Sequence, residues 1–284
     1  MSHQSAPAFE ATRRQSARSA ARAAGILYLI SWVSFLVGTV LVAPLRDVGH
    51  DLATLHTESG QLLAGLLLEF CNIAACTGFA VVLLPYLRRG GEALAHGYVA
   101  MRVLEGAAYL VAGVSAASLI TLSEVYVAAG SPGGDAFQAA QSVAVGQSTW
   151  ALTLHVMPYV TGAVLLYVLL YRTRLVPRYI AVWGLVAVAL LAAFNLMDAD
   201  VAAGGPAVLL VVPIAVNELF LAGWLIVKGF DQRALAHVAA HEIVGGQRRA
   251  ALDVSVRFDA QGRAPRAAGG HVPARERAAE QVLV

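Results

Sequence analysis

The sequence predicts an all-α integral membrane bundle of six transmembrane helices with both termini in the cytoplasm. Three observations lead to this fold class. Hydrophobic residues make up 58% of the 284-residue chain and charged residues only 13%, whereas a soluble globular chain carries about 25% charged residues. Six apolar stretches have the length of about 20 residues that a helix needs to cross a bilayer. Basic residues gather in every second loop between these stretches.

The first three predicted spans run from about Ala24 to Leu45, Gln61 to Leu87 and Gly97 to Ser123. The first contains no charge and is too long for the apolar part of a signal peptide, so we expect it to be a retained helix. The second contains Glu69, together with Cys71 and Cys76, which we expect to be buried apolar thiols. The third contains Arg102 and Glu105.

The last three predicted spans run from about Gln147 to Tyr171, Tyr179 to Met197 and Gly205 to Val227. The fourth is uncharged apart from any proton on His155, and the sixth contains Asn217 and Glu218. Residues 21–230 therefore form the predicted transmembrane domain. Residues 1–20 are polar, Ala-rich and basic and are predicted to be a disordered cytoplasmic arm, and residues 231–284 a mostly disordered cytoplasmic tail.

The loops alternate in basic charge along the chain. One set of flanking segments contains Arg13, Arg14, Arg18, Arg22, Arg88, Arg89, Arg172, Arg174, Arg178, Lys228 and Arg233. The loops between them contain Arg46 as their single basic residue, beside several acidic residues. Because basic residues stay on the cytoplasmic side of a membrane, this pattern places both termini inside. A wrong count of the spans would have inverted the charge pattern of the later loops.

Several ionisable or strongly polar residues lie inside the predicted spans. A charged side chain at the bilayer centre costs about 2.5–3.5 kcal/mol on insertion scales, so such residues face the bundle interior and find partners. From the helical rise, Glu69 and His155 lie about 10 Å below the outer edge of the membrane. A second set lies near the midplane: Asn72, Arg102, Glu105, Asn217 and Glu218.

These seven residues form the predicted polar cluster and candidate binding site. Arg102 and Glu105 are spaced i, i+3 and can pair within one helix. Glu218 needs a partner from another helix, and the sequence offers Arg102 as its only cation within a span. Two interpretations remain open. The cluster can lock the helices together, because interhelical polar bonds stabilise membrane bundles modestly, or it can bind an ion, a proton or a small molecule.

Five short motifs resemble one known family. They are the run from Arg22 to Leu29, Asp51-Leu52-Ala53-Thr54, Arg102-Val103-Leu104-Glu105, the run from Leu175 to Tyr179, and Asn217-Glu218 followed by the run from Gly223 to Phe230. In this order and spacing they resemble the bacterial membrane proteins grouped as domain-of-unknown-function family 4386, over about residues 20–230. The resemblance implies a six-span protein of the bacterial inner membrane and no established activity.

The chain contains no Gly-rich phosphate loop, no GxSxG sequence and no basic-aromatic patch for nucleic acid. We therefore expect no cofactor, no metal site, no catalytic residues and no nucleic-acid partner; the lipid bilayer is the expected partner. The first functional hypothesis is a transporter or ligand-binding protein in which Arg102 binds an anion, and Glu105 and Glu218 carry protons or cations. The alternatives are a non-catalytic sensor or assembly component with a structural cluster, and an intramembrane lipid-modifying enzyme.

Overall fold

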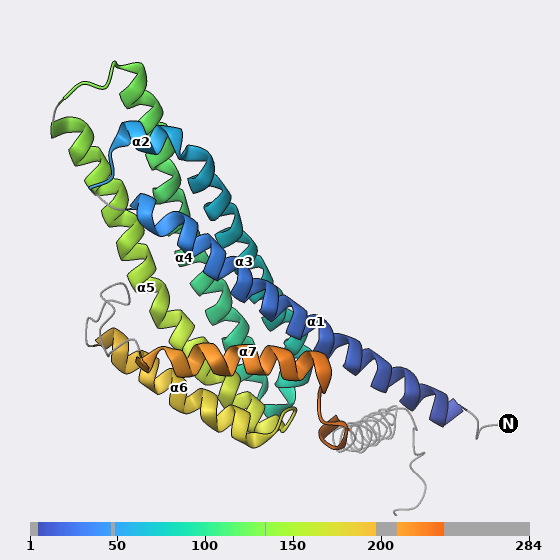
Figure 1. Ribbon diagram of the computed structural model, residues 1–284. Helices are drawn as coiled ribbons and strands as arrows, with labels where there is room; N and C mark the ends of the chain where they lie inside the picture. Colours follow the sequence, from blue (N-terminus) through green and yellow to red (C-terminus); the bar gives the residue numbers. More distant parts are fainter. Residues whose placement is uncertain (1–4, 47–48, 134, 197–208, 236–284) are drawn as a thin grey trace, which may run out of the picture. The chain divides into compact units, whose positions relative to one another are not determined.

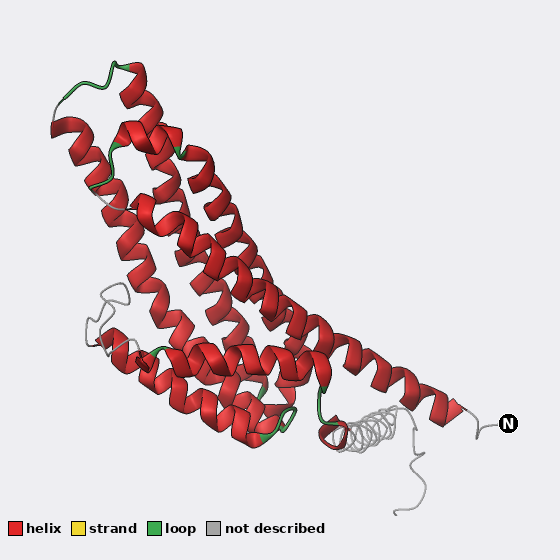
Figure 2. Cartoon of the chain, viewed as in Figure 1, coloured by secondary structure: helices red, strands yellow, loops and turns green. Residues whose placement is uncertain are grey.

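The computed structural model describes residues 5–46, 49–133, 135–196 and 209–235, and every regular element within these ranges is a helix (Figures 1 and 2). The long helices are α1 (Ser5–Val42), α3 (Ser59–Leu87), α4 (Glu92–Ala128), α5 (Asp135–Thr173), α6 (Arg178–Leu196) and α7 (Val212–Val227). The short ones are η1 (Ala43–Arg46), α2 (Leu52–Thr57) and η2 (Arg88–Gly90). The predicted all-α class is confirmed.

Five of the helices, α1 and α3 to α6, are long and apolar enough to cross a membrane. Helix α7 is apolar but has only 16 residues, which at about 1.5 Å per residue span about 24 Å of a hydrocarbon layer about 30 Å thick. The sequence predicted a sixth span that begins at about Gly205. Residues 205–208 lie outside the described ranges, and the described helix is shorter than predicted.

The outward faces of these helices carry large aliphatic side chains. On α1 these are Ile26, Leu29, Ile30, Val33, Leu36, Val37 and Val40, each at least 40% exposed. The opposite face of α1 buries the small residues Ala17, Ala21 and Ala24. Small residues inside and large apolar residues outside are typical of helices that pack within lipid, and a soluble protein rarely exposes so large an apolar surface.

The six long helices form a closed series of neighbours. Helix α1 packs on α3, α3 on α4, α4 on α5, α5 on α6 and α6 on α7, and α7 packs back on α1. Figure 1 shows α7 lying across α1, with α6 beside it. The short helix α2 packs mainly against α4. Asp51 caps α2, because its carboxylate accepts a hydrogen bond of 3.0 Å from the backbone N–H of Thr54.

Two close helix contacts depend on glycine. A Cβ atom at Gly25 on α1 would lie 2.7 Å from the carbonyl oxygen of Ala222 on α7. A Cβ atom at Gly65 on α3 would lie 2.4 Å from a side-chain carbon of Val42 on α1. Both distances are shorter than any ordinary contact, so only glycine lets α1 approach α7 and α3 this closely.

Two apolar cores lie at different levels of the bundle. The larger one includes Tyr28, Phe79, Tyr98, Tyr167 and Leu221. The smaller one includes Val42, Leu55, Leu62, Leu119 and Val145. On each of α1, α3, α4 and α5, the residues of one core lie closer to one end of the helix and the residues of the other core lie closer to the other end. The middle of each helix lies between the two cores, and there the polar residues gather.

The N-terminal arm differs from its prediction. The sequence predicted residues 1–20 to be disordered, but α1 begins at Ser5 and continues without a break into the apolar part of the helix. Alanine and arginine favour helix, and Ala17 and Ala21 are buried in the larger core.

After α7, the backbone N–H of Asp231 donates to the carbonyl of Leu175 at 2.9 Å. The tail from residue 236 onward, including most of the predicted disordered segment, lies outside the described residues.

Candidate functional site

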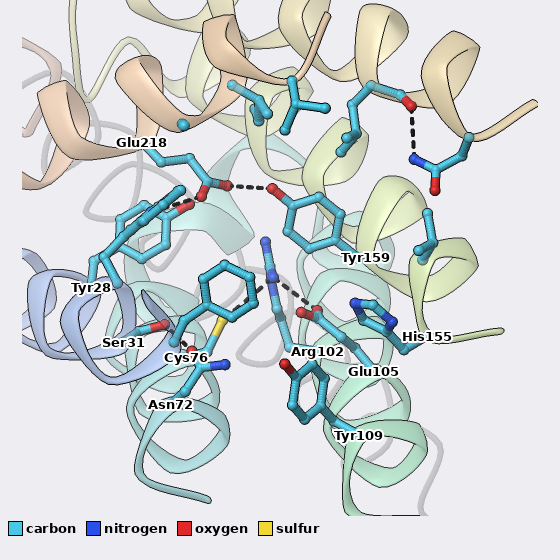
Figure 3. A pocket seen from close by; sticks show the side chains of 18 of the residues that line it. Tyr28, Ser31, Asn72, Cys76, Arg102, Glu105, Tyr109, His155, Tyr159 and Glu218 are labelled. Carbon is cyan, nitrogen blue, oxygen red and sulfur yellow. Dashed lines mark hydrogen bonds and ion pairs between the residues drawn. The ribbon is translucent and has the colours of Figure 1, made fainter. Parts of the chain in front are cut away.

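A cavity of about 310 Å³ lies between the two apolar cores and is lined by all six long helices (Figure 3). Its polar lining consists of Ser31, Asn72, Cys76, Arg102, Glu105, His155, Asn195 and Glu218. Its aromatic lining consists of Tyr28, Trp32, Phe35, Tyr109, Tyr159 and Phe194. The volume lies within the range of about 300–1,000 Å³ that is typical of small-molecule sites.

Arg102 on α4 is the cation of this cavity, and its side chain is only 1% exposed. One terminal nitrogen, Nη1, donates to Glu105 Oε2 at 2.8 Å and to Cys76 Sγ at 3.4 Å. The guanidinium lies 5.2 Å from the ring centre of Tyr159 and 5.6 Å from that of Tyr98, within the range of cation–π attraction. The other two nitrogens, Nε and Nη2, have no hydrogen-bond partner.

Glu218 on α7 faces Arg102 across the cavity but forms no ion pair with it within the described residues. Two neutral donors hold its carboxylate instead. The indole N–H of Trp32 donates to Oε2 at 2.9 Å, and the hydroxyl of Tyr159 donates to Oε1 at 2.9 Å. Figure 3 shows the guanidinium of Arg102 pointing toward the space between Glu218 and Tyr159. The space therefore lies between a guanidinium with an unpartnered nitrogen and the carboxylate of Glu218, which has no ion-pair partner among the described residues.

Two further polar contacts complete the lining. Ser31 on α1 donates its hydroxyl to the side-chain oxygen of Asn72 on α3 at 2.6 Å. His155 on α5 contacts the backbone carbonyl of Leu152 through Nδ1 and lies edge-on to the ring of Tyr109, at 5.2 Å between ring centres.

Five of the seven residues in the predicted cluster line this one cavity: Asn72, Arg102, Glu105, His155 and Glu218. The structure thus brings together residues from α3, α4, α5 and α7 that are up to 146 positions apart in the chain, from Asn72 to Glu218. The other two predicted residues, Glu69 and Asn217, do not line it.

Glu69 has a partner that the sequence prediction did not assign to it. Arg46, which follows α1 and was placed in an outer loop, turns back and donates from both terminal nitrogens to the two oxygens of Glu69, at 3.2 and 2.8 Å. The side chains are 12% and 3% exposed, respectively. The expectation that Arg102 is the only buried cation is therefore wrong, because a long arginine side chain at a helix end can reach inward along its neighbour.

Asn217 is fully buried between α6 and α7. Its side-chain N–H donates to the backbone carbonyl of Ile180 at 3.1 Å. Because Ile180 belongs to α6, this hydrogen bond links α7 to α6. Asn217 thus stands one residue before Glu218 in sequence but on another side of α7, with a role in helix packing.

The prediction missed the aromatic residues that complete the site. Tyr28, Trp32 and Phe35 on α1 are spaced i, i+4 and i+7 and therefore share one helix face. In a span that is apolar on every side, such a face cannot be told from the lipid-facing surface by periodicity. Tyr159 was also missed, although it follows His155 by one helical turn. The expectation that both cysteines are buried is wrong for Cys71, which is exposed on the bundle surface, whereas Cys76 lies within reach of Arg102.

The lining of the cavity suits the binding of a small molecule. Across the described ranges, no three His, Cys, Asp or Glu side chains gather in a way that could hold a metal ion. What the cavity supplies is a set of donors and acceptors on apolar walls formed by Phe35, Val156, Leu191, Phe194 and Ile214. A few placed polar groups on mainly apolar walls are the usual composition of a small-molecule site.

Comparisons with known proteins agree with the resemblance noted in the sequence. The family described as a domain of unknown function, DUF4386, matches residues 23–229. No curated protein matches the chain, and no solved structure matches it. Since the match covers most of the chain, including every cavity-lining residue, the protein belongs to the DUF4386 family.

Proposed function

We propose that this member of the DUF4386 family is a six-span protein of the bacterial inner membrane, with both termini in the cytoplasm, that binds a small polar molecule in the Arg102–Glu218 cavity and carries it across the bilayer. Five helices of spanning length and the apolar outer faces support the membrane location. The alternation of basic loops supports the orientation.

The observation that carries the proposal is the incomplete pairing of Arg102. A buried donor without a partner costs about 1–3 kcal/mol, and a charged one costs more. A cluster whose only role was to hold helices together would satisfy these donors within the protein, as the Arg46–Glu69 pair largely does. At Arg102, two buried nitrogens have no partner among the described residues, and the side chain lines the cavity, so a ligand bound there is well placed to complete its hydrogen bonds.

The position of the cavity also favours transport over simple binding. It is formed jointly by α1, α3 and α4 from the first half of the chain and by α5, α6 and α7 from the second half. Each half contributes three helices, so the two halves have opposite topology in the proposed orientation. Many transporters bind their substrate near the midplane, between two such halves that rock against each other.

The native cysteines allow a direct test of the cavity. In a Cys71→Ala variant the only thiol is Cys76, which lines the cavity; in a Cys76→Ala variant it is Cys71, on the bundle surface. Under the proposal, a small water-soluble methanethiosulfonate reagent modifies Cys76 in vesicles and leaves Cys71, among lipid tails, largely unmodified. Failure of Cys76 to react in the folded protein would show that water does not reach Arg102, and the proposal would be wrong.

Transport itself is tested with the purified protein in sealed vesicles. Vesicles with and without the protein are loaded with radiolabelled amines, amino acids, carboxylates, sugars and nucleosides in turn, with and without a pH gradient. The proposal predicts protein-dependent exchange for one of these classes, and its abolition by modification of Cys76. If Cys76 reacts but no class exchanges, the cavity is open to water and the transport part of the proposal is wrong.

A further inference from the structure

We infer that the ligand of the Arg102–Glu218 cavity is a small organic carboxylate, and that it binds together with one proton taken up by Glu218. The inference rests on the proposed function and specifies its ligand class and its coupling. It follows from the two groups that the protein leaves incomplete on opposite sides of the cavity.

The first incomplete group is the guanidinium of Arg102. Its Nη1 is used by Glu105, whereas Nη2 is buried, has no partner and points into the cavity (Figure 3). A planar guanidinium prefers a planar acceptor with two oxygens, which is the geometry of a carboxylate. Tyr28, whose hydroxyl is also buried without a partner, lines the same cavity and offers a second donor.

The second incomplete group is the carboxylate of Glu218. The charges of Arg102 and Glu105 cancel within their 2.8 Å pair. Glu218 is 4% exposed, and the donors Trp32 and Tyr159 that hold its carboxylate are neutral. If a carboxylate ligand enters beside it, two negative charges meet in a medium of low dielectric, and the pair gains stability by binding a proton. Protonated Glu218 is neutral, so uptake of the ligand together with one proton leaves the net charge of the cavity unchanged.

The surroundings favour Glu218 over other sites for that proton. The titratable groups of the helices around Glu218 are Tyr28 on α1, Cys76 on α3, Arg102 and Glu105 on α4, and His155, Tyr159 and Tyr167 on α5. The cavity-lining residues of α6, namely Leu191, Phe194 and Asn195, carry no titratable side chain. Among the carboxylates, Glu105 already has the charge of Arg102. Glu218 is therefore the acid that gains most from a proton.

The apolar part of the ligand has a place as well. Leu191 and Phe194 of α6 and Ile214 of α7 form a wall beside the polar groups. A carboxylate with a short alkyl chain or a single ring can direct its oxygens to Arg102 and lay its apolar part against this wall. Butyrate and benzoate are suitable probes, and benzamide is an uncharged molecule of nearly the same shape as benzoate.

The test uses the full-length Cys71→Ala protein in nanodiscs and measures how each probe slows the modification of Cys76, together with calorimetric titration in two buffers of different ionisation enthalpy. We expect benzoate and butyrate to slow the modification at least tenfold at saturation and benzamide to have little effect. Calorimetry should show uptake of about one proton per carboxylate bound. Arg102→Gln should abolish the protection, whereas Glu218→Gln, which resembles the protonated acid, should keep it without proton uptake.

Several results would overturn the inference. Protection by tetramethylammonium or by glycine in place of benzoate would assign the site to a cation or a zwitterion and leave the proposed function intact. Reaction of Cys76 that no carboxylate slows, binding that is unchanged in Arg102→Gln, or proton uptake that persists in Glu218→Gln and disappears in His155→Gln would each contradict it. If Arg102→Gln does not fold, the two-buffer titration of the unsubstituted cavity still decides, because carboxylate binding without proton uptake contradicts the coupling.

Discussion

The Arg46–Glu69 pair offers the most direct test of the energetics described above. We predict that Arg46→Gln destabilises the folded protein by about 3–5 kcal/mol, the usual cost of removing one partner of a buried ion pair. The structure sets the magnitude in two ways. The pair has two hydrogen bonds, at 3.2 and 2.8 Å, so the loss includes both. The Glu69 side chain is 3% exposed, so solvent cannot replace the lost partner, while the 12% exposure of Arg46 favours the lower end of the range.

The appropriate measurement is a double-mutant cycle. The free energy of unfolding is measured in detergent for the wild type, Arg46→Gln, Glu69→Gln and the double variant, with retention of helix content as the check on folding. Replacing both charges leaves two neutral amides of similar size, so the double variant should recover most of the stability, and the coupling energy should exceed about 1.5 kcal/mol. A loss below about 1 kcal/mol in Arg46→Gln, the value of an exposed pair, would refute the assignment of Glu69 to a buried pair.

The remaining predictions concern the contacts that position the cavity. Gly25→Ala should lower stability by about 1–3 kcal/mol, because a Cβ there would lie 2.7 Å from the carbonyl oxygen of Ala222; the matched Gly223→Ala, with nothing within 4 Å, should be neutral or stabilising, and equal losses in thermal unfolding would contradict the contact. Asn217→Leu removes the 3.1 Å hydrogen bond to Ile180 and should lower the free energy of unfolding by about 1–3 kcal/mol without changing the modification rate of Cys76. A changed rate would contradict a role of Asn217 in helix packing alone. Trp32→Phe and Tyr159→Phe each remove one 2.9 Å donor that stabilises the ionised form of Glu218, so each should favour its protonation and strengthen carboxylate binding at neutral pH more than at acidic pH. An effect independent of pH would contradict the role of that donor.

Much of the fold could be predicted from the sequence because membrane helices are recognised by their length and composition. Runs of about 20 apolar residues have few alternatives in a chain with so few charges. The boundaries were harder to predict. The alanine-rich arm before α1 has the composition of a surface segment, yet it continues the helix because Ala17 and Ala21 find a buried surface against the bundle. That surface is created by tertiary packing, and no local pattern reports it.

For the site, the cost of a charge in lipid was the useful guide. It led to Arg102, Glu105 and Glu218, which the structure places around one cavity. It could not identify Tyr28, Trp32 and Tyr159, because an aromatic side chain is as acceptable toward lipid as toward a cavity. The same energetic cost could not assign ion-pair partners. Glu69 pairs with Arg46, which follows the end of α1, and the position of Arg46 along the chain does not show that its side chain turns back toward Glu69.

A comparison of Glu69, Glu105 and Glu218 within the described helices distinguishes acids that have a partner arginine from the acid that has none. Glu69 has Arg46, and Glu105 has Arg102, each at 2.8 Å. Glu218 has only neutral donors. Glu69 and Glu105 are therefore both neutralised by an arginine within the protein. Among the described residues, Glu218 has no cation beside it, and Arg102 on the other side of the cavity has a nitrogen without an acceptor. A carboxylate ligand supplies the acceptor for Arg102, and a proton neutralises Glu218. Release of either one weakens the binding of the other, which is the coupling that a proton-linked carrier requires.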